Sequence, residues 1–217
     1  MPPIDNVLAV LLAGFFLSAT PGPSMLYVLS RTVGQNRTAG LASALGLALG
    51  GMVLAVATAL GLAKLFEEMP SIVVGLRYVG SAYLIWLGAT MILNARSEAK
   101  TVLIVKEVRT RSLGSIIWQG VLVEFLNPKT VLFFALFLPP FVDTGLGVSS
   151  EVDTRVQLLT LGVLVPLTAI PVDIGVAFMG GALVQKINGQ ERTRERMAWF
   201  GGLILIAISV NLHLGMI

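Results

Sequence analysis

The sequence has no cysteine among its 217 residues and only one histidine. The absence of cysteine excludes disulfides, thiol redox chemistry and cysteine-ligated metal, although it does not identify a compartment. There is also no phosphate-binding glycine loop, no cluster of metal ligands and no nucleophile paired with a base. We therefore expect no enzyme, no catalytic residue, no bound metal and no cofactor, and no direct use of ATP by this chain.

Charged residues are also scarce, at 12% of the chain, whereas soluble domains carry about 25%. Hydrophobic residues make up 55%, and the mean hydropathy is +0.86. Such a chain cannot cover a water-facing surface, so the lipid bilayer is expected to be its solvent. At roughly 20 residues for each span, the chain accommodates six transmembrane helices and leaves no room for a soluble domain.

The net charge of +3 does not indicate a nucleic-acid partner, because the basic residues are divided among short loops and form no continuous stripe. The apolar stretch Val7–Ala19 resembles a signal peptide, but no Lys or Arg precedes it, and the first basic residue is Arg31. This stretch is therefore predicted to be retained as the first helix.

Apolar runs separated by polar breaks predict an all-α membrane protein that forms a single transporter-like domain over residues 1–217. The spans are placed at 6–30, 39–63, 71–94, 114–141, 157–184 and 197–215. A loop is expected at 95–113. It includes an apolar stretch, Thr101–Val105, that fits either a strand or an interfacial segment. A second polar loop is expected at 143–156.

Basic residues alternate between the two sides of this arrangement. The loops after spans 1, 3 and 5 contain 11 of the 15 Lys and Arg residues, namely Arg31, Arg37, Arg96, Lys100, Lys106, Arg109, Arg111, Lys186, Arg192, Arg194 and Arg196. The opposite side has only Lys64, Arg77 and Arg155. The positive-inside rule therefore places both termini outside the cytoplasm.

The two halves of the chain, 6–94 and 114–215, share a pattern. Gly14 and Gly120 are each followed, after six residues, by a helix-breaking cluster. The segments 77–81 and 198–202 also match in place and type. Because each half has three spans, the second half is expected to be inverted relative to the first, as in secondary transporters with alternating access. The alternative is chance similarity between apolar helices.

The two helix-breaking clusters contain proline, which removes a helical hydrogen bond. In hydrocarbon the freed groups need partners, so such breaks tend to line a buried or watery cavity. Asn127 before Pro128 is also a helix-start signal, and Thr20 before Pro21 is expected to play a similar part. Half-helix N-termini inside the membrane attract a carboxylate, such as that of an amino acid. The alternative is that both breaks are simple kinks.

This interpretation predicts a substrate site at mid-membrane. Its expected substrate-binding residues are Pro21, Gly22, Pro23, Ser24, Asn127, Pro128 and Lys129.

Three ionisable residues fall within spans, namely Glu124, Lys129 and Asp173. Inserting each of them at mid-bilayer costs at least about 2.5–3.5 kcal/mol, so each is expected to have a functional or structural role that compensates for this cost. A carboxylate in a partly dry cavity binds a proton more readily than in water, which makes Glu124 and Asp173 candidates for proton coupling. Lys129 is expected to bind a substrate carboxylate or to adjust a neighbouring carboxylate. The alternatives are a buried pair that neutralises itself and snorkelling to the membrane surface.

Two other features concern helix packing. Gly46 and Gly50 form a GxxxG pattern that is expected to let helices pack closely. Span 5 is expected to bend at Pro166, with Pro171 two residues before Asp173.

Several of these motifs occur together in a known family. Ala19–Pro23, the glycine-rich Gly40–Gly51, and Asn127–Lys129 followed by Phe133-Phe134 and Pro139–Phe141 resemble the lysine exporter family, in its homoserine/threonine efflux branch. The resemblance spans nearly the whole chain. It implies a multi-pass exporter of amino acids or derivatives in the bacterial inner membrane, driven by an ion gradient.

The resemblance also marks individual residues. The Pro-Gly-Pro and Asn-Pro-Lys residues are motif positions, and Asp173 matches an acidic site often seen in span 5. Ser24 and Glu124 stand where the family often has a polar amide. An acidic residue at Glu124 leaves open a cationic substrate group or a different coupling ion.

Three functions remain in competition. The favoured one is proton-coupled amino-acid export, with a small-molecule substrate, a proton and the bilayer as partners and a homodimer as an open alternative. An uncoupled channel or membrane scaffold predicts instead that Glu124→Gln and Asp173→Asn leave flux or assembly intact. A membrane enzyme or electron-transfer subunit is disfavoured by the lack of cysteine and of a paired-histidine haem pattern.

Overall fold

The structure is a computed structural model of the chain, and it describes residues 2–213 apart from Pro21, Met69, 101–108, 144–150 and Gln190. The described residues form helices and no strand. In chain order these are α1 (Ile4–Ala19), α2 (Pro23–Gly34), α3 (Arg37–Glu68), α4 (Pro70–Lys100), α5 (Leu113–Phe125), α6 (Pro128–Leu132), the π-helix η1 (Phe133–Phe137), the 3-10 helix η2 (Pro139–Phe141), α7 (Glu151–Gly189) and α8 (Glu191–His213).

These bounds follow the six expected segments, and they shorten the two expected loops. Helix α4 extends to Lys100 and α7 begins at Glu151. Residues 95–100 and 151–156, which were expected in loops, are therefore helical. The expected segment Thr101–Val105 and most of the second polar loop lie outside the described residues.

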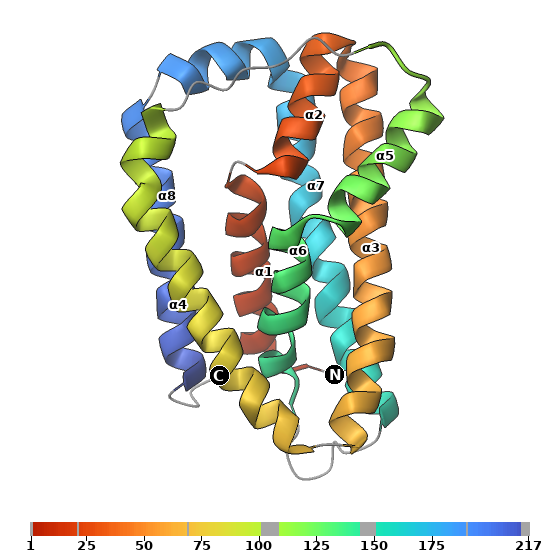
Figure 1. The fold of residues 1–217 in the computed structure, drawn as a ribbon, viewed down its shortest axis with the longest axis vertical. Coiled ribbons are helices and arrows are strands. Elements are labelled where there is room, and N and C mark those ends of the chain that lie inside the picture. The colour runs from red at the N-terminus through yellow and green to blue at the C-terminus, as the bar shows by residue number, and fades with distance from the viewer. Residues whose placement is uncertain are drawn as a thin grey trace.

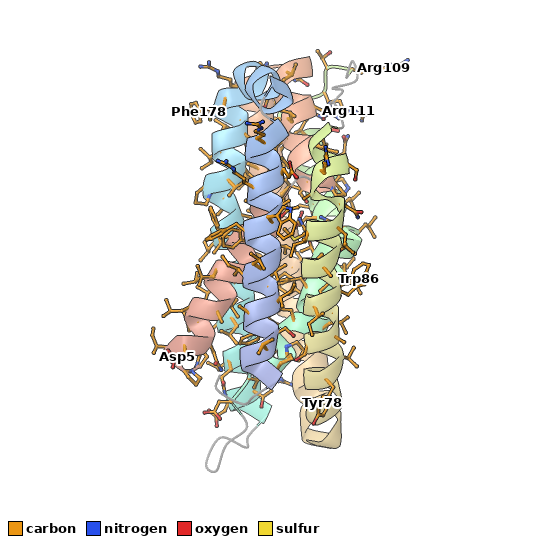
Figure 2. All side chains as sticks on the ribbon, turned by 90° about the vertical axis from the view of Figure 1, so that its left-hand side faces the viewer. Asp5, Tyr78, Trp86, Arg109, Arg111 and Phe178 are labelled. Carbon is orange, nitrogen blue, oxygen red and sulfur yellow. The ribbon has the colours of Figure 1, made fainter. Side chains whose placement is uncertain are left out.

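The chain passes repeatedly from one end of the bundle to the other (Figure 1). The turn between α2 and α3, the beginning of α5 and the junction of α7 with α8 lie at the upper end, and both termini lie toward the lower end. Figure 2 places Arg109 and Arg111 at the upper end and Asp5 and Tyr78 toward the lower one. The basic connections therefore share one end of the molecule.

Helices α3 and α7 contain the two long apolar segments. Arg37–Gly61 and Val152–Gly180 are each long and apolar enough to cross a bilayer. The pair α1–α2 and the pair α5 with Lys129–Phe141 are each bent by 50°. If each bent pair counts as one span, the described residues give up to four candidate spans. The two remaining spans expected from the sequence fall on α4 and α8, which are not among these candidates.

Small residues allow α3 to pack closely against its neighbours. A Cβ added to Gly46 would lie 2.2 Å from the carbonyl oxygen of Ile117 and 3.0 Å from the Cα of Gly120. A Cβ on Gly51 would lie 2.9 Å from the Pro166 ring. The prediction of close packing around the GxxxG pattern of α3 is confirmed, because only a glycine lets these backbones approach so closely.

Phenylalanines form the core below the second break. Phe133, Phe134, Phe137 and Phe141 are at most 1% exposed, and the Phe133 and Phe137 rings stack with their centroids 4.2 Å apart. The π-helix η1 carries three of these rings, and single π turns of this kind occur frequently at functional sites. The side-chain amide of Asn6 in α1 donates to the Phe141 carbonyl at 2.7 Å and so ties the end of this segment to the bundle.

Helix α7 differs from the expected bend at Pro166. Helical backbone angles continue through both prolines, and the departure lies at Gly180, where φ is 2° and ψ is −90°. The Pro166 ring packs directly on Gly51 of α3, which has no side chain. At Gly180 a Cβ would lie 2.5 Å from Cγ2 of Thr32, so close packing on α2 accompanies the break. Beyond it the chain crosses the upper end of the bundle (Figure 1).

Arg31, which was expected in a basic loop, is instead buried in α2 and only 5% exposed. Its guanidinium donates to the Gln119 side-chain oxygen at 2.8 Å and to the Arg109 carbonyl at 3.1 Å. It also lies 5.6 Å from the centroid of the Tyr27 ring. The expectation of a loop position was wrong because Gln119 within α5, the Arg109 carbonyl before it and the aromatic ring provide partners for a buried cation.

Candidate functional site

The first break separates α1 from α2. Helix α1 ends with Thr20 as its C-cap, and both the backbone N–H and the hydroxyl of Thr20 donate to the Phe16 carbonyl, at 3.1 and 2.6 Å. The expectation that Thr20 begins the next half-helix is therefore wrong, because its side chain turns back to α1. Helix α2 begins at Pro23, with Gly22 as an N-cap that has no side-chain hydrogen bond. Pro21 lies outside the described residues.

The second break follows the prediction closely. Asn127 is the N-cap of α6, and its side-chain oxygen accepts a hydrogen bond from the Lys129 backbone N–H at 3.1 Å. Pro128 occupies the first turn, where its missing N–H leaves no helical bond unmade. Asn127 is 4% exposed, so this cap is formed inside the protein.

Ser24, in the first turn of α2, joins the two breaks. Its hydroxyl donates to the Glu124 carboxylate and accepts from the side-chain amide of Asn127 at 2.9 Å. The other Glu124 oxygen accepts from the Thr130 hydroxyl at 2.8 Å. Glu124 is thus held by one hydroxyl from each broken helix, which compensates for part of the cost of a carboxylate inside the bundle.

Lys129 makes a second connection, in the opposite direction. Its ammonium donates to the carbonyl of Leu17 and to that of Thr20, the latter at 3.2 Å. Carbonyls in the last turn of a helix lack intrahelical partners, and the negative end of the helix dipole lies there. Lys129 therefore caps α1 across the break. Its side chain points into the bundle, so the snorkelling alternative does not hold.

Asp173, in α7, completes the set of charged residues. Its side chain is only 6% exposed, and it accepts no hydrogen bond from any residue that the structure describes. It lines the same cavity as Glu124 and Lys129, so the three ionisable residues predicted within spans are brought together.

The cavity lies between the two breaks, α3 and α7. Its polar lining includes Thr20, Gly22, Ser24, Glu124, Lys129 and Asp173. It offers ≈ 40 Å³ to the centres of water-sized spheres, and one water needs about 10–15 Å³ on this measure. The cavity therefore has room for a few waters, and a larger ligand requires it to widen. Across the described residues, no group of three or more His, Cys, Asp or Glu gathers in a way that could hold a metal ion.

Gly22 is not required by the space around it. A Cβ there would lie 3.8 Å from the Thr20 carbonyl and 3.9 Å from the Lys129 side chain, which is ordinary contact. Its φ of −167° is extended backbone that any residue adopts. Gly22 thus contributes to the site mainly through its backbone.

Two parts of the site were not found from the sequence. Thr130 is 4% exposed and binds Glu124, but a threonine in an apolar helix commonly bonds to its own backbone, so nothing in the sequence singles it out. The α1 carbonyls that Lys129 binds were also missed, because backbone groups carry no sequence signal.

The fold and the site define a multi-pass membrane protein with two broken helices around a polar cavity. The sequence matches the family described as LysE type translocator over residues 15–215, and the chain belongs to this family. The resemblance noted from the sequence motifs is therefore confirmed.

Individual relatives agree with this assignment. An uncharacterized membrane protein of Synechocystis sp. is 32% identical over 96% of this chain and 95% of its own length. An uncharacterized membrane protein of Pseudomonas aeruginosa is 34% identical over 60% of this chain and 61% of its own length. A leucine efflux protein of Salmonella typhimurium is 30% identical over 64% of each. The chain thus matches less than two thirds of the length of the last two. No solved structure matches the sequence.

Proposed function

We propose that the protein is a secondary transporter that exports amino acids, with leucine-like molecules as its first candidates, across the bacterial inner membrane. Membership of the LysE type translocator family and relatives named leucine efflux proteins support this proposal. The observation that carries it is the joining of the two breaks, through Ser24 and Lys129, around a cavity with two carboxylates.

The proposed site suits a zwitterion. The carboxylate of an amino acid is attracted to the Lys129 ammonium and to the backbone N–H groups at the beginning of α2, where the N-cap Gly22 makes no side-chain hydrogen bond. Its ammonium is attracted to Glu124 and Asp173 across the same cavity. Positive and negative groups in the lining of one cavity thus match the two charges of the substrate.

The two carboxylates have different proposed roles. Glu124 is fixed by Ser24 and Thr130, which suits it to substrate positioning as well as to proton binding. Asp173 is buried in the wall of the same cavity, and no hydrogen-bond donor to it lies among the described residues. We assign it as the main proton carrier, which releases its proton when the substrate ammonium approaches.

The proposed architecture has six spans in two inverted three-helix repeats, with α4 and α8 as the third span of each. The two bent pairs support it because they have the same 50° bend and run in opposite directions (Figure 1). Gly88 and Gly202 support it further, because a Cβ on either would lie 2.6 Å from the carbonyl oxygen of the other. Such reciprocal contacts are what a two-fold relation produces. The positive-inside rule then places both termini in the periplasm.

Efflux from cells tests the proposal. Cells that produce the protein are preloaded with a panel of labelled amino acids, and efflux is followed with and without an uncoupler. The proposal expects faster efflux of a few neutral amino acids, lost with the uncoupler and in Glu124→Gln and Asp173→Asn. Asp5→Asn is the matched control, because Asp5 is exposed and far from the cavity.

Each outcome of this experiment discriminates. Wild-type efflux that survives the uncoupler and both variants favours the uncoupled channel. No efflux of any amino acid, with the protein detected in the membrane, contradicts amino-acid export.

A further inference from the structure

A second cavity lies on the other side of Lys129, against α4. It is lined by Trp86, Leu87, Thr90, Met91 and Asn94 of α4, together with Thr20 and Lys129. Its volume is ≈ 290 Å³, compared with ≈ 40 Å³ for the cavity between the breaks, and it is the more open of the two, since Trp86 and Asn94 in its lining are exposed. Figure 2 places Trp86 between the two ends of the molecule, so this cavity lies at intermediate depth.

The two cavities share Thr20 and Lys129. The Lys129 ammonium, bound to carbonyls at the end of α1, therefore lies on the boundary between them. A molecule with its carboxylate near Lys129 has little room in the smaller cavity for more than its charged groups. The larger cavity is the adjacent space that can accept the rest of the molecule.

The chemistry of the larger cavity is selective. Trp86, Leu87 and Met91 provide an apolar wall, and the polar groups at its edge, Thr90 and Asn94, are uncharged. Trp86, Thr90 and Asn94 are four residues apart, which places them along one face of α4. Lys129 is the charged group of this lining. A cationic side chain would be repelled by it, and an anionic one would lose hydration against the apolar wall.

We propose that this second cavity holds the side chain of the transported amino acid and selects neutral, aliphatic side chains over charged ones. The proposal rests on the proposed export function and adds the determinant of substrate choice. A lipid chain is the other occupant that an apolar wall admits, and the experiments separate the two.

Filling the cavity tests the proposal through substrate ranking. Thr90→Phe places a ring in the cavity, whereas Leu93→Phe places one on the same helix at a position that is 79% exposed and lines neither cavity. Thr90→Phe is expected to lower leucine efflux about tenfold relative to alanine efflux, since loss of a side-chain pocket has effects of this size. Leu93→Phe is expected to leave the ratio unchanged.

The outcomes separate this proposal from the proposed function. Suppose that the wild type exports amino acids. If Thr90→Phe then lowers leucine and alanine efflux equally, or changes neither of them, the side-chain pocket is refuted and export stands. If the wild type exports no amino acid, the proposed function itself fails.

A binding measurement gives a readout that does not depend on transport. The chain has three tryptophans, so Trp118→Phe combined with Trp199→Phe leaves Trp86 as the sole indole. In the purified protein, leucine is expected to change Trp86 emission in a saturable way, and arginine is not. Emission that responds to neither amino acid, or equally to both, would overturn the proposal.

Discussion

At the scale of residues, Lys129 connects the two breaks, because its ammonium binds the exposed carbonyl end of α1 while its backbone N–H is capped by Asn127. Lys129→Met removes the charge at nearly constant length and is expected to abolish efflux. Lys129→Arg keeps a cation and is expected to retain part of it, so the two variants separate loss of charge from loss of packing. Efflux and the amount of protein in the membrane are measured together. Full activity of Lys129→Met would refute a role for the charge.

Asn127 is expected to contribute to stability as well as to the site. Asn127→Ala removes the helix cap, at a cost of about 1 kcal/mol, together with the hydrogen bond to Ser24. Asn127→Ser keeps a capping oxygen and is expected to be intermediate in thermal stability, measured as Tm in detergent. Equal Tm values for all three proteins would show that the cap does not stabilise the fold.

The residue scale also shows how far sequence reasoning reaches. The cap at Asn127 was predictable because capping depends on residues close in the chain. The role of Thr20 was predicted wrongly. A threonine between two helices can cap the end of the first or the beginning of the second, and here its hydroxyl bonds back to α1. The contacts of Lys129 with α1 join residues more than 100 positions apart, and a single sequence carries no signal for such a pairing.

At the scale of elements, α3 offers a matched pair of glycines. A Cβ on Gly46 would lie 2.2 Å from the Ile117 carbonyl, whereas one on Gly61 meets nothing within 4 Å. Gly46→Ala is expected to destabilise the protein by roughly 1–3 kcal/mol, because the helices must move apart. Gly61→Ala is expected to be neutral or slightly stabilising, since alanine favours the helix. Thermal unfolding in detergent measures both, and equal Tm values would contradict the close contact.

Helix positions were predictable from the sequence, but the bend in α7 was not. The apolar runs predicted the segments of all the long helices, because a chain in lipid must satisfy its backbone hydrogen bonds internally. The break in α7 lies at Gly180 rather than Pro166, and it accompanies contact with Thr32 in α2. Proline is visible in a sequence, whereas contact with another helix is not.

At the scale of the whole molecule, the lack of cysteine makes the proposed orientation directly testable. Single cysteines are introduced as Asp5→Cys at one end and Thr110→Cys at the other, both at exposed positions. The outer membrane is removed from the cells and the inner membrane is left intact. An impermeant maleimide is then expected to label Asp5→Cys at once and Thr110→Cys only after the inner membrane is permeabilised. The reverse pattern would place the basic end outside and contradict the orientation.

The central claim is that export of an amino acid is coupled to entry of a proton at Asp173. The purified protein in liposomes, loaded with labelled leucine and placed in an acidic or a neutral outside buffer, tests this most directly. We predict that the inward proton gradient accelerates leucine efflux in the wild type and in Asp5→Asn, and has no effect in Asp173→Asn. Leucine efflux that is equally fast with and without the gradient in the wild type would contradict coupled export and indicate a passive pathway.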